Sequence, residues 1–119
     1  MGDVSYQVRA GWSRPGDIWF ITAGGEVAGY CWTVVDAGQS SHVGGVVGRV
    51  RMIGVSPRYR GRGLARVVLT ASIAYLRGEG VEAVELSVDR RNWRARRLYE
   101  SLGFRRRAIT VWYQRRLRP

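Results

Sequence analysis

The segment Val55–Ala65 (VSPRYRGRGLA) holds the residues with the clearest chemical potential in this chain. Its glycines at 61 and 63 let the backbone approach a ligand closely and adopt positive φ. Good helix formers follow from Leu64, and the first N–H groups of a helix lack partners inside that helix. A phosphate placed there would meet those donors, the positive end of the helix dipole and the charges of Arg60 and Arg62. The pattern therefore predicts a phosphate-binding loop over residues 60–65.

Other phosphate-binding patterns fit this segment less well. A P-loop needs a lysine before Ser or Thr, and all 20 basic residues of this chain are arginines. The dinucleotide fingerprint would need a glycine at position 66, where Arg66 stands. A basic surface loop followed by a core helix remains the structural alternative. An Arg-Gly nucleic-acid segment is weaker, because the two pairs run directly into an apolar helix.

Strands and helices on both sides must position this loop. A strand–glycine–strand pattern predicts a hairpin of strands at 18–22 and 27–35, and only a short strand is expected before it, around 6–9. A glycine- and serine-rich loop separates the hairpin from a strand at 49–55. Apolar and helix-forming residues then predict a helix at 64–77, apolar nearly all round and packed against a sheet. They also predict a strand at 83–88, an amphipathic helix at 92–102 and a closing strand at 108–115. This order predicts an α/β (α+β) layer fold with a mixed sheet.

Composition is that of a globular protein, with 45% apolar residues and a formal net charge of +11. The length of 119 residues favours one domain over 1–119, with an irregular segment at 1–16. Cys31 is the single cysteine, so no intrachain disulfide can form, and a reducing compartment is expected. With no apolar run of membrane-spanning length and no secretory pattern at residues 1–12, we expect a soluble cytoplasmic protein without a membrane partner. Most of the five tryptophans are expected in the core, while Trp32 and Trp112 are candidates for an acceptor cleft or a dimer face.

The loop resembles the acetyl-CoA loop of the GNAT superfamily of N-acetyltransferases. That pattern is Gln or Arg, two residues, Gly, one residue, then Gly or Ala, and Arg60, Gly63 and Ala65 occupy its places. A second motif agrees: NWRARRLYESLGF is similar to the family's Asn-x-x-Ala-x-x-x-Tyr helix with its Leu-Gly-Phe ending, through Asn92, Ala95, Tyr99 and 102–104. The likeness covers about residues 17–116. A weaker likeness, through 29–33 and 54–55, points to the mycothiol-synthase-like branch.

The resemblance implies a mostly antiparallel central sheet and roles for particular residues. The pantetheine arm of acetyl-CoA would lie between the strands 49–55 and 83–88. It would hydrogen-bond the main chain of Ile53 and Val55, beside Gly54. The loop residues Arg60, Gly61, Arg62, Gly63, Leu64 and Ala65 would hold the pyrophosphate, and Asn92 would contact the cofactor. Tyr99 would protonate the departing thiolate, a role open to a group with an ordinary pKa of about 10; the alternative is a core aromatic.

Two departures from the family pattern bear on catalysis. Many members carry a glutamate as general base early in the strand before the loop, and Arg49 stands there. The plausible substitutes are Glu26, Asp36, His42 and Glu85, of which none matches the position; without a base, an α-amine (pKa about 8) or another small amine is the favoured acceptor. The family's first strand and two helices also have only about sixteen residues to fit into here. This predicts a shortened acceptor wall, a wall completed by a partner subunit, or a chain that is a fragment.

Three hypotheses follow. The first is an acetyl-CoA-dependent N-acetyltransferase that acts on a primary amine by direct attack, as a homodimer and with no metal. The second is a catalytically degenerate subunit that binds CoA. The third is a basic module that binds nucleic acid or the ribosome, for which binding would depend steeply on salt. Cys31 as an acyl carrier would need an activating partner that the sequence does not supply.

Overall fold

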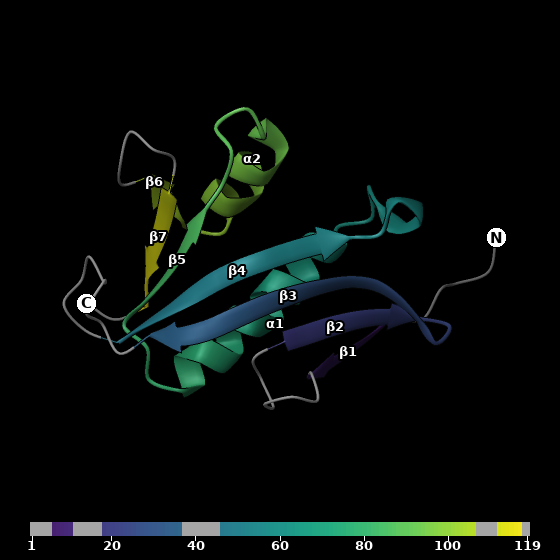
Figure 1. The fold of residues 1–119 in the computed structure, drawn as a ribbon, viewed down its shortest axis with the longest axis horizontal. Helices are drawn as coiled ribbons and strands as arrows, with labels where there is room; N and C mark the ends of the chain where they lie inside the picture. Colours follow the sequence, from purple (N-terminus) through teal and green to yellow (C-terminus); the bar gives the residue numbers. More distant parts are fainter. Residues whose placement is uncertain (1–5, 11–17, 37–45, 107–111, 118–119) are drawn as a thin grey trace. The chain divides into compact units, whose positions relative to one another are not determined.

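A computed structural model describes residues 6–10, 18–36, 46–106 and 112–117 (Figure 1). These residues form two compact units, Met1–Thr33 with Arg51–Tyr75 and Val34–Val50 with Leu76–Pro119. The described strands are hydrogen-bonded in the order β1-β2-β3-β4-β5-β7-β6, with both parallel and antiparallel pairs. The mixed, mostly antiparallel sheet predicted from the sequence is therefore confirmed. The predicted positions Trp12 and His42, and residues 108–111 of the predicted last strand, lie outside the described residues.

The first unit begins with an antiparallel meander. Strand β1 (Tyr6–Ala10) pairs with β2 (Ile18–Ala23), which pairs in turn with β3 (Glu26–Asp36). The β2–β3 turn uses Gly24 and Gly25, whose φ angles of 59° and 81° suit glycine. This confirms the predicted hairpin and the short strand before it.

Helix α1 (Leu64–Gly78) lies along one face of this meander (Figure 1). Ile21, Ala23 and Ala28 form a buried cluster with Tyr59 and Leu64, against which Tyr6 and Val55 pack. Arg66, Val67 and Thr70 are exposed, so the helix is buried along one side and not all round. Ser72, in contrast, is buried and bonds its hydroxyl to the Val68 carbonyl at 2.9 Å, which satisfies it inside the helix.

The second unit is built on a parallel strand pair. The first residues of β4 (Val47–Val55) pair with β5 (Ala83–Ser87), and that ladder ends at Val50 and Leu86. Strand β7 (Trp112–Arg116) lies antiparallel to β5, and the two-residue β6 (Arg105–Arg106) lies at its far side. At Gly48 an added Cβ would lie 2.7 Å from the side chain of Leu76, so only glycine lets these two residues approach so closely.

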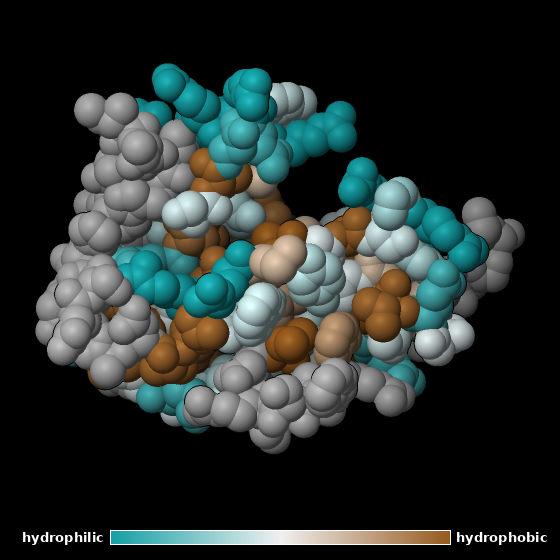
Figure 2. All heavy atoms as spheres, viewed as in Figure 1, coloured by the Kyte–Doolittle hydropathy of each residue, from teal (hydrophilic) through white to brown (hydrophobic). Residues whose placement is uncertain are grey.

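Helix α2 (Trp93–Ser101) follows β5 and is shorter by a residue at each end than predicted, because Asn92 and Leu102 are its caps. Gly103 (φ 93°) then turns the chain so that the buried Phe104 returns against the ring of Tyr99. Hydrophilic side chains gather over this helix (Figure 2), where Arg90, Arg91, Arg94 and Arg97 are exposed.

The expectation that most tryptophans are core residues is wrong for Trp93, whereas Trp32, a candidate for a cleft or a dimer face, is exposed. Trp93 is 55% exposed, and the guanidinium groups of Arg94 and Arg97 lie 5.3 and 5.8 Å from its ring centre. Trp32 is exposed beneath Arg51. Trp19 is partly buried beside Tyr75, whereas the side chain of Trp112 is not among those described. None of the described helices is long and apolar enough to cross a membrane.

Candidate active site

The predicted loop joins the end of β4 to the start of α1. After Val55 the chain makes one 3-10 turn, η1 (Pro57–Tyr59), and Gly61 and Gly63 then take φ angles of 79° and 74°. The first helical hydrogen bond runs from the Val67 N–H to the Gly63 carbonyl at 3.2 Å. The N–H groups of Leu64 and Ala65 precede this bond, as expected at a helix start. The positive φ at both glycines is as the sequence predicted.

Each of the two loop arginines, Arg60 and Arg62, donates a hydrogen bond from its guanidinium group to another residue of the first unit. Arg60 donates from Nε to the Val55 carbonyl at 3.3 Å, which closes the loop against the end of β4. Arg62 donates from Nη1 to the hydroxyl of Tyr6 at 3.1 Å. Both side chains stay exposed and hydrophilic groups gather over the loop (Figure 2), so this end of the unit is electropositive.

Tyr59, whose importance the sequence did not reveal, secures the start of the loop. Its buried ring lies in the hydrophobic cluster, and its hydroxyl donates to Glu26 at 3.0 Å. Glu26 also forms an ion pair with Arg58 at 3.1 Å. The hydrogen bond to Glu26 raises the pKa of Tyr59 above its ordinary value, so the phenol keeps its proton and goes on donating. Glu26, a candidate base in the sequence, is thus engaged in holding the loop.

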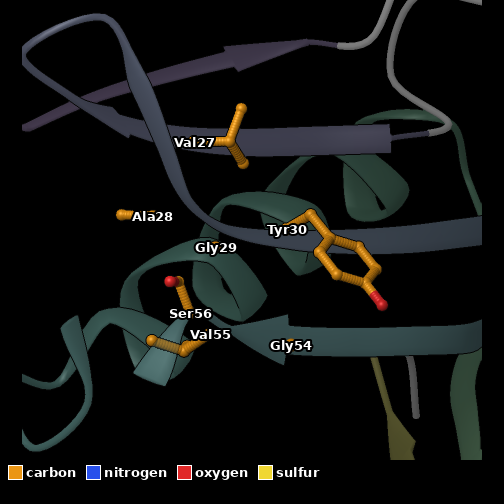
Figure 3. A pocket seen from close by; sticks show the side chains of 7 residues that line it. All are labelled: Val27, Ala28, Gly29, Tyr30, Gly54, Val55 and Ser56. Carbon is orange, nitrogen blue, oxygen red and sulfur yellow. The ribbon is translucent and has the colours of Figure 1, made fainter. Parts of the chain in front are cut away.

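A pocket of about 300 Å³ lies where β3 and β4 meet at the start of the loop (Figure 3). Two glycines shape it. A Cβ on Gly54 would lie 2.9 Å from the ring of Tyr30, and one on Gly29 would lie 3.0 Å from the Gly54 carbonyl. Gly54 and Val55, both predicted cofactor residues, line this pocket, and their neighbour Ile53 is not part of the lining.

In the second unit Tyr99 lies on the inner side of α2 and is 5% exposed. Its ring centre is 6.0 Å from that of Phe104 and 6.1 Å from that of Tyr113, in tilted contacts. The hydroxyl of Tyr113 accepts from Arg96 at 3.1 Å and donates to Glu100 at 3.2 Å. Tyr99 is thus part of an aromatic cluster, which fits the interpretation of this residue as a core aromatic. Its hydroxyl remains the candidate acid.

The comparisons with known proteins decide the family. Residues 3–104 match the Acetyltransferase (GNAT) family. The chain belongs to this family.

This GNAT chain is similar to mycothiol acetyltransferases over most of its length. It is 39% identical over 113 residues to that of Thermobispora bispora, which covers 95% of this chain and 38% of the relative. The mycothiol acetyltransferase of Thermomonospora curvata is 39% identical over 103 residues, or 87% of this chain and 32% of the relative. The chain therefore spans about a third of the length of these relatives.

Solved structures show the same GNAT fold. The ribosomal-protein-S18-alanine N-acetyltransferase of Escherichia coli superimposes with a TM-score of 0.72 and 26% identity, over 86% of this chain and 69% of that one. Arabidopsis thaliana NAA60 superimposes with a TM-score of 0.74 and 20% identity, over 85% of this chain and 77% of that one.

At Arg49, which the sequence resemblance placed where many family members have a glutamate, the structure shows an ion pair. Arg49 and Glu85 are register partners across β4 and β5, and Arg49 Nη1 lies 3.1 Å from Glu85 Oε1. The spacing along the chain could not reveal that Glu85, one of the four substitutes considered, lies directly opposite position 49. The side chain of Asp36 and all of His42 lie outside the described residues.

The predicted cofactor residue Asn92 has a structural role in this GNAT chain. Its Oδ1 accepts from the Ala95 N–H at 3.2 Å, which caps α2. Its amide nitrogen is not used by this cap, so the side chain can still donate to a ligand. Among the described residues, no group of three His, Cys, Asp or Glu side chains could hold a metal ion.

Cys31 is buried on β3 and lies in contact with Ser72 of α1. Burial raises its pKa to about 11, against a smaller opposite effect of the hydrogen bond with Ser72. At pH 7 only about one thiol in ten thousand would then be ionised, and the thiolate is the reactive form. Within the described part of the chain, the one effect that lowers this pKa is the smaller of the two, which argues against an acyl-carrier role.

Proposed function

We propose that this chain transfers the acetyl group of acetyl-CoA to a primary amine. The observation that carries the proposal is the loop between β4 and α1, where two glycines at positive φ precede the first turn of a helix. Membership of the GNAT family supports it, as do relatives named mycothiol acetyltransferases and the Arabidopsis thaliana neighbour, whose structure is a complex with acetyl-CoA.

Acetyl-CoA would be held at three places. The N–H groups from Gly61 to Ala65 and the start of α1 would bind the pyrophosphate, with Arg60 and Arg62 adding positive charge. The pantetheine arm would add to the edge of β4 through the main chain of Ile53 and Val55, which follow the point where the β4–β5 ladder ends. Asn92 would donate its amide N–H to the cofactor while its oxygen caps α2.

The reaction would proceed by direct attack. The lone pair of a neutral amine forms the new bond to the thioester carbonyl carbon, and a backbone N–H stabilises the oxyanion that results. Collapse of this intermediate breaks the carbon–sulfur bond, and the sulfur takes the electron pair. Tyr99 gives its proton to the sulfur and becomes a phenolate. The amine nitrogen loses its proton to water or a base, from which a proton then returns to Tyr99 and restores the neutral phenol. No acyl group is attached to the protein, in keeping with the high pKa of Cys31.

By the family resemblance, Arg49 would stand where the usual base stands, and Arg49 is paired with Glu85. Without that base, the favoured acceptor would be an α-amine or another small amine, whose pKa of about 8 leaves part of it neutral at pH 7. Amines related to mycothiol belong first in a test, given the names of the relatives. A homodimer and a cytoplasmic location remain part of the proposal. Contact with nucleic acid or the ribosome is secondary; it would arise from the net charge of +11.

The test is calorimetric titration of the purified chain with acetyl-CoA, CoA and ATP, followed by an assay of CoA release with a panel of amines. We expect micromolar binding of acetyl-CoA and CoA, weaker binding of ATP, and turnover with at least one amine. Binding without turnover on any amine would favour the degenerate CoA-binding subunit. Absence of acetyl-CoA binding would overturn the proposal.

A further inference from the structure

Both ends of the loop are fixed in one hydrophobic cluster. Tyr59, just before the loop, and Leu64, at its end, belong to the cluster with Ile21 and two alanines. Between them the chain passes through Gly61 and Gly63, which lose more conformational freedom on ordering than any other residue. If the loop were free to move before binding, the cost of ordering it would be subtracted from the affinity for its ligand.

Arg62 is the residue between the two glycines, and its side chain is held from two directions. Its guanidinium lies 5.6 Å from the ring centre of Tyr59, in a cation–π contact. Its Nη1 donates to the hydroxyl of Tyr6 at 3.1 Å. Tyr59 is held in turn by its hydrogen bond to Glu26, at the β2–β3 turn. These contacts link the middle of the loop to the meander.

Tyr6 can hold Arg62 because β1 is in register with the end of β2. It pairs with Ala23, at the last position of that strand, and its ring packs against the cluster that contains Tyr59. The hydroxyl of Tyr6 is therefore carried by a side chain that is itself fixed. A short strand around residues 6–9 was predicted, but nothing in the sequence indicated that Tyr6 would contact the loop.

We propose that Tyr6 is a positioning residue for the cofactor loop. It fixes Arg62 on the ring of Tyr59, and Arg62 fixes the Gly61–Gly63 backbone in the conformation that receives the pyrophosphate. Arg62 then contributes to cofactor binding mainly by holding the loop backbone in place, and the attraction between its charge and the pyrophosphate is secondary. This inference rests on the proposed binding of acetyl-CoA and adds the residues that organise the site before the ligand arrives.

The test compares dissociation constants of acetyl-CoA for the wild-type chain and for Tyr6→Phe, Arg62→Lys, Arg62→Gln and the double variant Tyr6→Phe/Arg62→Gln. Loss of one hydrogen bond should weaken binding about two- to tenfold in Tyr6→Phe. Arg62→Lys should weaken it as much as Arg62→Gln, because lysine keeps the charge but lacks the planar group that stacks and bonds at once. The double variant should bind no more weakly than Arg62→Gln alone.

Two further readouts separate positioning from direct charge and from general damage. The salt dependence of binding should be unchanged in Tyr6→Phe, and amide hydrogen exchange of residues 61–63 in the free protein should be faster. The matched control is Tyr75→Phe, a tyrosine of the same unit that packs on Trp19 away from the loop, with affinity and exchange as in the wild type.

The outcomes are distinguishable. Unchanged affinity and unchanged exchange in Tyr6→Phe, with the wild type binding acetyl-CoA, would overturn this inference and leave the proposed function standing. Affinity retained in Arg62→Lys and lost in Arg62→Gln, with a weaker salt dependence in the latter, would make Arg62 a direct phosphate ligand and also overturn it. A wild-type chain that does not bind acetyl-CoA would remove both proposals.

Discussion

Glu85 lies directly opposite Arg49 in the parallel β4–β5 ladder, and the two side chains form an ion pair at 3.1 Å. The two partners differ in exposure: the side chain of Glu85 is 2% exposed and that of Arg49 is 30% exposed. A carboxylate buried to this degree is costly to desolvate, and a neighbouring cation offsets part of that cost. Removing Arg49 would leave this carboxylate without the pair, so we expect the arginine to have a structural role here.

Arg49→Met should lower the free energy of unfolding by about 3 kcal/mol, because it leaves the buried charge of Glu85 without this partner. Urea denaturation at pH 7 measures the change. The matched control is Arg51→Met, two residues further along β4, where the arginine is exposed and stacks on Trp32; a loss below about 1 kcal/mol is expected. Equal losses in the two variants would show that the ion pair is not what stabilises this region.

Gly63→Trp should abolish acetyl-CoA binding and leave the protein folded. An added Cβ at Gly63 meets nothing within 4 Å, so the fold has room for a side chain, but the φ of 74° is strained for any residue other than glycine. The indole would fill the space where the pyrophosphate must approach the backbone. Calorimetric titration measures the loss.

The control for this variant is Gly80→Trp. Gly80 has a φ of 81°, also has nothing within 4 Å of an added Cβ, and follows α1 rather than preceding it. It should show a similar loss of stability and full affinity for acetyl-CoA. If Gly63→Trp binds as tightly as Gly80→Trp, the loop is not the cofactor site.

Local patterns predicted the loop and most elements because their causes are local. Glycines at positive φ, the helix start at Leu64 and the hairpin turn at Gly24 each depend on a few neighbouring residues. The burial of Tyr99 also followed from its place on the apolar stripe of α2.

Contacts between distant segments could not be predicted in this way. The pairing of Arg49 with Glu85 depends on the register of two strands joined through a helix, and the contact of Arg62 with Tyr6 spans 56 positions of the chain. Nothing in the order of residues marks Tyr59 as the side chain that links the loop to Glu26. The two-residue strand β6 was missed because its pairing depends entirely on β7.

Asn92 allows its structural and ligand-binding roles to be separated. Asn92→Asp keeps an oxygen that can cap α2, so stability should stay within about 0.5 kcal/mol of the wild type, but it removes the amide donor and should weaken acetyl-CoA binding. Asn92→Ala should lose about 1 kcal/mol of stability as well. Thermal unfolding and titration measure the two effects. Unchanged affinity in Asn92→Asp would reduce this residue to a helix cap.

Cys31 should react slowly in the folded protein and destabilise it at high pH. With a pKa of about 11 in the fold against an ordinary 9.0, its thiolate fraction at pH 8 falls about a hundredfold on folding. Its pKa is raised, so its contribution to stability is complete below pH 9 and is lost as the pH rises from 9 to about 11. Labelling with a disulfide reagent, with and without urea, measures the first effect. Rapid labelling of the folded chain, or an acetyl group found on Cys31 during turnover, would contradict this assignment.

Tyr99→Phe should slow turnover by about a hundredfold or more and leave the dissociation constant of acetyl-CoA nearly unchanged. The substitution removes one hydroxyl and keeps the ring that packs against Phe104 and Tyr113, so the aromatic cluster stays intact. The control is Tyr113→Phe, in the same cluster, whose hydroxyl bonds to Arg96 and Glu100. It should lose about 1 kcal/mol of stability and keep its turnover number. If Tyr99 is the general acid, Tyr99→Phe must turn over more slowly than Tyr113→Phe. Equal rates for the two variants would leave Tyr99 a core aromatic and would require another proton donor.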